Sequence, residues 1–130
     1  MIIVHTNENG GVSVTTPTGE ISIEEVLAKD CPDHAIIINS ADLPNKHNDF
    51  FNAWELVDGQ VTVNLTKATN ITKERLRAER KPLLEAQDVL YMRATEQGTD
   101  TSAIILEKQR LRDITKITAT TLDELKELSA

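Results

Sequence analysis

The hydrophobic pattern of this chain changes at Asn64, and that change decides the fold class. Before Asn64 the apolar residues stand in short alternating or continuous runs, which is typical of strands. After Asn64 they recur about every 3.6 residues, which is typical of helices. The 130 residues allow one domain or a small domain with an appendage. We therefore expect an α+β chain: a small β-rich domain over residues 1–65, then a helical arm over residues 66–130.

A β-hairpin is the clearest prediction within the β-rich domain. Asp58-Gly59 is a strong signal for a two-residue turn, because glycine adopts positive φ without strain. A turn at that place pairs Leu56 with Val61 and Trp54 with Val63, and it puts all four side chains on one face. This self-consistent register supports the hairpin.

Further strands and one short helix are expected before the hairpin. Residues 2–4 and 12–14 are apolar runs on either side of the turn signal at residues 9–11. Ser22-Ile-Glu-Glu25 fits a capping box, which predicts a short helix ending near Lys29.

The segment between this helix and the hairpin contains one more predicted strand. Residues 35–38 are continuously apolar, so we expect a strand buried on both faces. Residues 40–52 contain Pro44 and many polar residues, and we expect a loop with a helical turn there. Only four aromatic residues are present in the chain, so Ile, Leu and Val must fill a small core.

A long helix opens the helical arm. Thr66 or Asn70 is expected to cap it, and it runs to Gln97, where Gly98 ends it. Pro82 removes one backbone hydrogen bond and clashes with the preceding turn, so a kink or short break is expected there.

Two further helices follow, and they complete a helical hairpin with a short terminal helix. Thr101 or Ser102 is expected to cap a helix through Arg112, which returns antiparallel and covers the second part of the long helix. The apolar residues expected in that contact are Leu83, Leu84, Val89, Leu90, Ile104, Ile105 and Leu111. Thr121-Leu-Asp-Glu124 is a second capping box and predicts the terminal helix.

A basic cluster lies in the first part of the long helix. From Lys67 to Lys81 the chain has six Lys or Arg residues and two Glu residues, a local net charge of +4, whereas the whole chain has −7. A basic arm on an acidic body is suited to docking against another protein, and simple solvation is the alternative. Nucleic acid is an improbable partner, because the chain is acidic and no aromatic residue interrupts the cluster. The residues expected to contact a partner are Lys73, Arg75, Arg77, Arg80 and Lys81.

The same segment also predicts association. Leu76, Leu83 and Leu90 are seven residues apart, but the polar residues Arg80 and Gln87 between them disfavour a long parallel coiled coil. Residues 71–81 have few apolar residues to cover them, and so short a helix is marginal in water by itself. We therefore expect a homo-oligomer or a hetero-complex in which a second copy or an acidic partner holds this segment.

No enzyme, metal or cofactor site is expected. His5, His34 and His47 lie in different elements without a pair four residues apart, and a zinc site needs such convergence. Cys31 and His34 are close in sequence, but a loop that ends a helix explains them adequately. No apolar run approaches the length of about 18 residues that spans a bilayer, and residues 1–7 lack a basic region and a cleavage site, so secretion is not expected.

Several motifs from the hairpin onward resemble a family of small proteins encoded in phage and prophage tail regions. The motifs are Ala53-Trp-Glu-Leu-Val-Asp-Gly59, Leu65-Thr-Lys-Ala68, Arg75-Leu-Arg-Ala-Glu-Arg-Lys-Pro-Leu-Leu84, Asp88-Val-Leu-Tyr-Met-Arg-Ala94, Glu96-Gln-Gly98, Lys108-Gln-Arg-Leu-Arg-Asp113 and Thr120-Thr-Leu-Asp-Glu-Leu125. The resemblance implies a non-enzymatic structural component or adaptor of the phage tail or baseplate, present in the virion and in the bacterial cytoplasm during assembly. A tail or tail fibre assembly chaperone, which binds its client transiently, is the alternative. The implied partners are tail, baseplate or fibre proteins.

Overall fold

The computed structural model describes all residues, 1–130, and the chain divides into two compact units. The N-terminal unit is residues 1–68 and the helical unit is residues 69–130, where the sequence predicted a boundary after residue 65. Helices, including 3-10 turns, contain 55% of the residues and strands 15%. Antiparallel strands come first and helices follow, which confirms the predicted α+β class.

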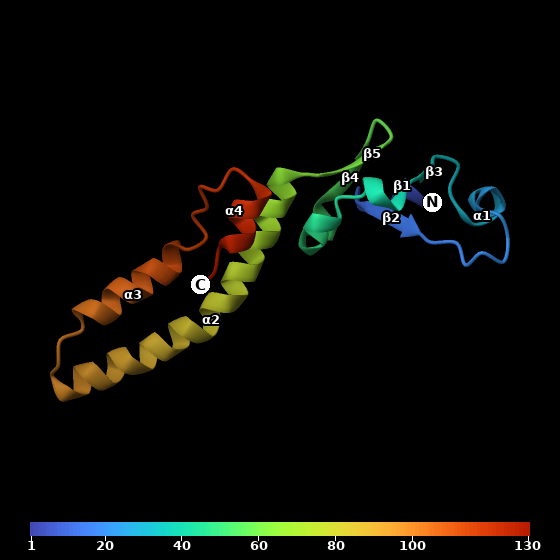
Figure 1. Ribbon diagram of the computed structural model, residues 1–130. Coiled ribbons are helices and arrows are strands. Elements are labelled where there is room, and N and C mark those ends of the chain that lie inside the picture. The colour runs from blue at the N-terminus through green and yellow to red at the C-terminus, as the bar shows by residue number, and fades with distance from the viewer. The chain divides into compact units, whose positions relative to one another are not determined.

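A three-stranded antiparallel sheet forms the centre of the N-terminal unit (Figure 1). Its order is β2-β1-β3, with β1 at Ile2–Thr6, β2 at Val12–Thr15 and β3 at Ile36–Ile38. Side chains of β1 alternate between two separate apolar clusters: Ile2 and Val4 belong to one, and Ile3 belongs to the other. The middle strand is therefore the strand that is buried on both faces.

The expectation that residues 35–38 form a doubly buried strand is wrong in part. These residues do form β3, but it is an edge strand of three residues, and each of its isoleucines is only half-buried. A continuous apolar run gives no information about whether a strand is central or at an edge, because both positions can bury side chains against neighbouring elements.

The predicted hairpin is confirmed in its turn and its register. Strands β4 (Trp54–Val57) and β5 (Gln60–Val63) pair Trp54 with Val63 and Leu56 with Val61. Asp58 and Gly59 have φ of 50° and 79°, the left-handed conformations that a primed two-residue turn needs. Trp54 is only 2% exposed and packs in the cluster that contains Ile2 and Val4.

The remaining elements of this unit are helical. Helix α1 (Ile23–Asp30) starts as predicted, with the Ser22 hydroxyl accepting a hydrogen bond from Glu25 N at 3.3 Å, and Val26 packs on Ile3. For residues 40–52 a loop with a helical turn was predicted; the structure has the 3-10 helices η1 (Ser40–Asp42) and η2 (Asn45–Ala53) there, so this segment is more helical than expected.

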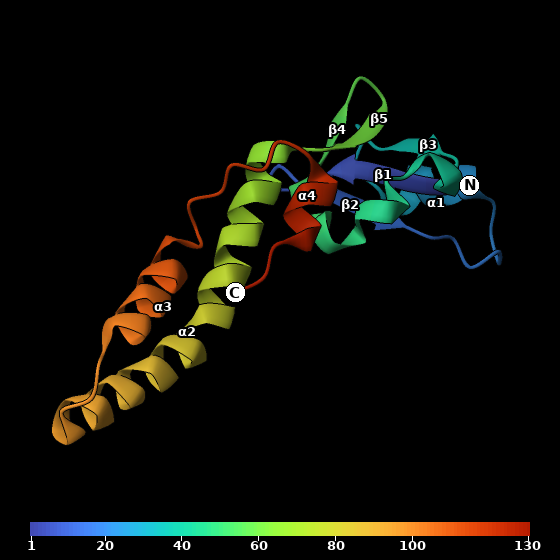
Figure 2. The same ribbon diagram turned by 60° about the vertical axis from the view of Figure 1, so that its left-hand side comes forward.

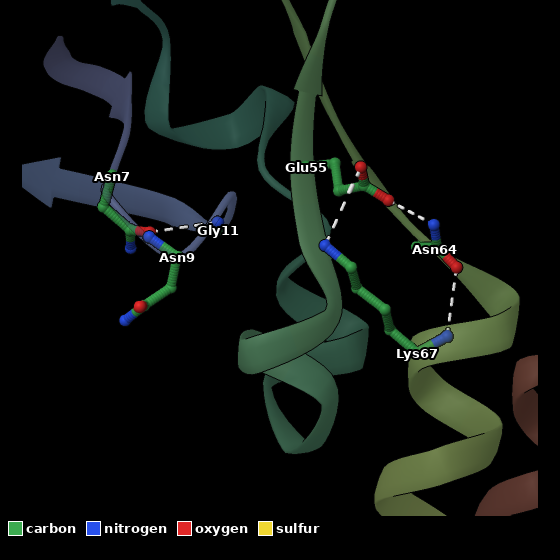
Figure 3. Close-up of polar contacts among 6 residues, drawn as sticks. All are labelled: Asn7, Asn9, Gly11, Glu55, Asn64 and Lys67. Carbon is green, nitrogen blue, oxygen red and sulfur yellow. Dashed lines mark hydrogen bonds and ion pairs between the residues drawn. The ribbon is translucent and has the colours of Figure 1, made fainter.

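Helix α2 (Leu65–Gln97) begins one residue after β5 ends. Asn64, and not the predicted Thr66 or Asn70, caps it, because Asn64 Oδ1 accepts a hydrogen bond from Lys67 N at 3.0 Å. Asn64 Nδ2 in turn donates to Glu55 Oε1, and Lys67 Nζ lies 3.9 Å from Glu55 Oε2 (Figure 3). The predicted caps come too late in the sequence, because the helix begins directly after β5.

Helix α2 continues through Pro82 without a break, and Figures 1 and 2 show it changing direction near its middle. A proline within a helix leaves the carbonyl four residues earlier without its usual donor, which is a common cause of such a bend. The helix ends at Gln97, and Gly98 follows with φ of 69°, so the predicted stop is confirmed.

Two helices accompany α2 in the helical unit. Helix α3 (Ser102–Asp113) returns alongside the second half of α2, and α4 (Leu122–Glu127) lies beside its first half (Figures 1 and 2). The predicted capping box of α4 is present, because the Thr121 hydroxyl accepts a hydrogen bond from Glu124 N at 3.2 Å. Not one helix has both the length and the apolar content needed to cross a membrane.

The predicted distribution of apolar cover along α2 is wrong in part: Leu84 and Ile104 are half-buried and Leu111 is buried, as expected, but other residues differ. In the first half (residues 69–81), residues 71–81 were expected to lack cover, yet Thr72 and Leu76 are fully buried. The second half (residues 82–97) was expected to be covered by α3, yet Leu83 and Leu90 are 41% and 45% exposed. The reason is that α4, which the sequence analysis left without a position, packs on the first half.

Candidate partner-docking site

The five basic residues that were predicted to bind a partner all lie on the first half of α2. They project in different directions, because residues along a helix are 100° apart around its axis. Two of the five bind backbone groups of the same chain, and three lie along one line of the helix.

Arg75 joins α2 to α4. Its Nη1 lies 3.0 Å from Glu79 Oε1, one helical turn away, and its Nη2 donates to the carbonyl oxygen of Leu125 at 3.2 Å. Leu125 is fully buried. Arg75 therefore helps to hold the terminal helix on α2.

Glu79 completes this contact from the other side. Its Oε2 accepts a hydrogen bond from the backbone N–H of Ala130 at 3.1 Å. That hydrogen bond and the neighbouring guanidinium of Arg75 lower the pKa of the Glu79 carboxyl from its ordinary value of 4.5. The carboxylate is thus charged at neutral pH and ties the last residues of the chain to α2.

Arg80 binds the end of α3. Its Nη1 donates to the carbonyl oxygens of Leu111 at 3.4 Å and Arg112 at 3.0 Å. The last carbonyls of a helix have no partner within the helix and form the negative end of its dipole, so a guanidinium is favourable there. Arg80 therefore fixes the C-terminal end of α3 against the first half of α2.

The other three basic residues form what we call the basic ridge: Lys73, Arg77 and Lys81. They are four residues apart, so they lie on one side of α2. Arg77 pairs with Glu74 on the same helix, and its side chain is 48% exposed. The side chains of Lys73 and Lys81 form no hydrogen bond or ion pair with the rest of the chain.

Lys67, the residue of the basic cluster that lies in the N-terminal unit, also has partners within the chain. Lys67 pairs with Glu55 of strand β4 (Figure 3), and its Nζ lies close to the turn at Gly10. Asn7 organises that turn, since its Oδ1 accepts hydrogen bonds from Asn9 N and Gly11 N, each at 3.0 Å (Figure 3). Lys67 therefore stabilises the start of α2.

The sequence analysis missed an exposed apolar surface on the second half of α2 and on α3. Its members are large side chains that are 38% to 72% exposed: Leu83, Val89, Leu90, Tyr91, Met92, Ile105 and Leu106. The sequence contained one signal for this surface. The apolar residues of the second half of α2 form a broad stripe, and a single facing helix with few apolar residues covers only one side of it. Exposed apolar groups in such numbers are typical of interaction surfaces.

The residues considered for chemistry serve the N-terminal unit. Cys31 is half-buried and packs with the cluster around Ile3 and Val26. His34 Nε2 lies 3.0 Å from the carbonyl oxygen of Thr6, and its ring meets that of His5 edge-on at 5.8 Å. The structure contains no group of three or more His, Cys, Asp or Glu side chains that could hold a metal ion.

No protein-family model matches this chain, and neither a curated protein nor a solved structure is significantly similar to it.

Proposed function

We propose that this chain is a non-enzymatic protein of a phage virion, a structural component or adaptor of the tail or baseplate that acts through protein–protein contacts. The setting rests on the resemblance of residues 53–125 to small proteins of phage tail regions. The mode of action rests on the basic ridge. The partner is an acidic surface of a neighbouring tail, baseplate or fibre protein.

The observation that carries this proposal is that Lys73 and Lys81 are the two basic residues of the cluster at residues 67–81 whose side chains are left without a partner in the chain. Arg75 and Arg80 bind carbonyl oxygens of the same chain, and Lys67 pairs with Glu55. The ridge therefore presents positive charge that the fold itself does not use. Exposed charge pairs contribute only about 0.2–1 kcal/mol each, so the ridge steers and orients the partner more than it sets the affinity.

The location is tested by mass spectrometry of purified virions of the phage that encodes the chain. We expect peptides of the chain in intact particles at a fixed ratio to a known tail protein. Their absence from the particles would overturn the virion proposal. If the chain is absent from virions but co-purifies with a tail or fibre protein from infected cells, it acts as an assembly chaperone instead.

The docking face is tested by reversing the charge of the two unpaired lysines. We expect the double variant Lys73→Glu, Lys81→Glu to reach virions at a level at least fivefold below that of the unmodified chain. The control is Lys29→Glu with Lys116→Glu, two exposed lysines outside the ridge, of which Lys116 pairs with Asp113; it changes the net charge equally. Equal incorporation of the two variants, with unchanged circular dichroism, would reject the ridge as the contact.

A further inference from the structure

The leucines of α2 form a stripe whose exposed part contains Leu83 and Leu90 and lies between the buried residues Leu76 and Ala94. Leu76, Leu83 and Leu90 are seven residues apart, and an α-helix drifts by only about 20° per seven residues, so they share one side. Leu76 is fully buried, whereas Leu83 is 41% and Leu90 is 45% exposed. The same stripe thus changes from core to surface within one helix.

The cover of this stripe ends where α4 and the residues after it end. The last contact is the hydrogen bond from Ala130 N to Glu79 Oε2, and Glu79 lies one turn before Leu83. Helix α3 leaves Leu83 and Leu90 exposed, although Ala94, one turn after Leu90, is buried; the ion pair between α3 and α2 lies on a neighbouring side of α2. That side is marked by Lys108, whose Nζ lies 2.7 Å from Asp88 Oδ1 and 5.0 Å from the centre of the Tyr91 ring.

We propose that a second copy of this chain covers the exposed part of the stripe. In the resulting homodimer the two α2 helices pack antiparallel, with Leu83 of each copy against Leu90 of the other. Ala86 lies midway between these leucines on the adjoining side and is small enough to let the helices approach closely. The dimer differs from the association that the sequence predicted, because it uses the second half of α2 and not residues 71–81.

Charge complementarity favours a second copy in this orientation. Arg93 has no hydrogen-bond or ion-pair partner in its own chain. When Leu83 pairs with Leu90, Arg93 comes opposite residue 80 of the second copy and next to Glu79, whose carboxylate is 38% exposed and is also bound by Arg75 and by Ala130 N. The Arg80 side chain is directed to the carbonyls at the end of α3. A parallel arrangement would instead place Arg93 against Arg93, which is unfavourable.

Self-association is measured on the purified full-length chain by sedimentation equilibrium over a hundredfold range of concentration. We expect a reversible monomer–dimer equilibrium. The double variant Leu83→Glu, Leu90→Glu should weaken it at least tenfold, with unchanged circular dichroism. The control is Leu106→Glu, which alters the most exposed leucine of the chain, on the outer side of α3, and should leave the equilibrium unchanged.

The orientation is measured by disulfide formation in a Cys31→Ser background, because Cys31 is the chain's one cysteine. A disulfide requires Cα atoms within about 7 Å. A mixture of the single variants L83C and L90C should therefore cross-link to each other much faster than either variant cross-links to itself. This measurement also decides the matter if the double glutamate variant loses its helical signal.

Three outcomes would overturn the proposal. They are a strict monomer at the highest concentration, a dimer that withstands both glutamate substitutions in a folded chain, and self-linking of L83C that is as fast as the mixed reaction. Any of these would leave a different protein as the occupant of the stripe. The dimer is independent of the proposed virion function, which is read from the composition of particles, so either proposal can fail alone.

Discussion

The two halves of α2 differ in a way that their composition does not suggest. The first half is the basic part of the chain, yet Thr72 and Leu76 within it are fully buried. The second half is richer in large apolar residues, yet Leu83 and Leu90 remain exposed. The difference shows that the burial of a side chain on α2 depends on how many neighbouring helices pack against that half. Helix α4 and the end of α3 meet the first half, whereas α3 alone accompanies the second.

Arginine makes this arrangement feasible. The guanidinium groups of Arg75 and Arg80 each donate to backbone carbonyls of another helix. A lysine presents a compact charge and matches such sites less well than a planar guanidinium. The distinction explains why the arginines at these two positions are part of the fold, while Lys73 and Lys81 remain on the surface.

The largest expected effect comes from truncating the same residue type in each half. Leu76→Ala should destabilise the chain by about 3 kcal/mol, because it leaves a cavity in a fully buried site. Leu83→Ala should cost less than about 1 kcal/mol in the monomer, because its side chain is 41% exposed. Urea unfolding at a concentration where the chain is monomeric measures both. Equal losses would mean that the stripe is evenly covered and would remove the contrast between the halves.

A second pair of variants compares two adjacent basic residues. Arg80→Met should lower the free energy of unfolding by about 1 kcal/mol, because the C-terminal carbonyls of α3 lose a charged donor at a partly exposed site. Lys81→Met should change it by less than about 0.5 kcal/mol, since Lys81 binds nothing in its own chain. Thermal unfolding followed by circular dichroism gives both values. A larger loss for Lys81→Met would contradict the assignment of the two roles.

The turn between α2 and α3 gives a third test, confined to the second half. Gly98 has φ of 69°, so Gly98→Ala should cost about 1 kcal/mol from backbone strain alone. An added Cβ would meet no atom within 4 Å, so steric contact contributes nothing. Hydrogen exchange should quicken near residues 94–105 and stay unchanged near Leu76. Gly98→Asn is the control with a smaller expected effect, because asparagine tolerates positive φ.

The smallest expected effect is a dependence on pH that is limited to the first half. The pKa of Glu79 is lowered in the folded chain, so its stabilisation is complete above its ordinary pKa of 4.5 and is lost as pH falls through the folded value. Amide exchange should therefore show α4 and the residues after it loosening first in acid. In Glu79→Gln this acid-induced loosening should be reduced, with weaker protection already at pH 6. An unchanged pH profile in that variant would exclude Glu79 as the cause.

The fold was predictable from the sequence wherever local chemistry decides it. The turn at Asp58-Gly59, the caps at Ser22 and Thr121 and the stop at Gly98 each depend on a few adjacent residues. These predictions are confirmed. The start of α2 was predicted wrongly because it depends on where β5 ends. The pairing of β5 with β4 decides that end, and the cap residues alone do not.

The candidate site was less predictable because it depends on contacts between distant segments. Arg75 bonds to a carbonyl 50 positions later, and Arg80 bonds to carbonyls 31 and 32 positions later. Nothing in the neighbouring sequence distinguishes these arginines from Lys73 or Lys81. Whether the basic ridge binds a partner stays a prediction until the charge-reversal variants are measured.

The seven-residue spacing of the α2 leucines also implies a handedness. Because an α-helix completes seven residues about 20° short of two full turns, a stripe through Leu83 and Leu90 winds slowly around the helix. A helix that stays in contact with both leucines must cross α2 at about +20°, the left-handed crossing of coiled coils. Two copies joined along this stripe would therefore form a left-handed pair, and each would meet the other at a fixed inclination.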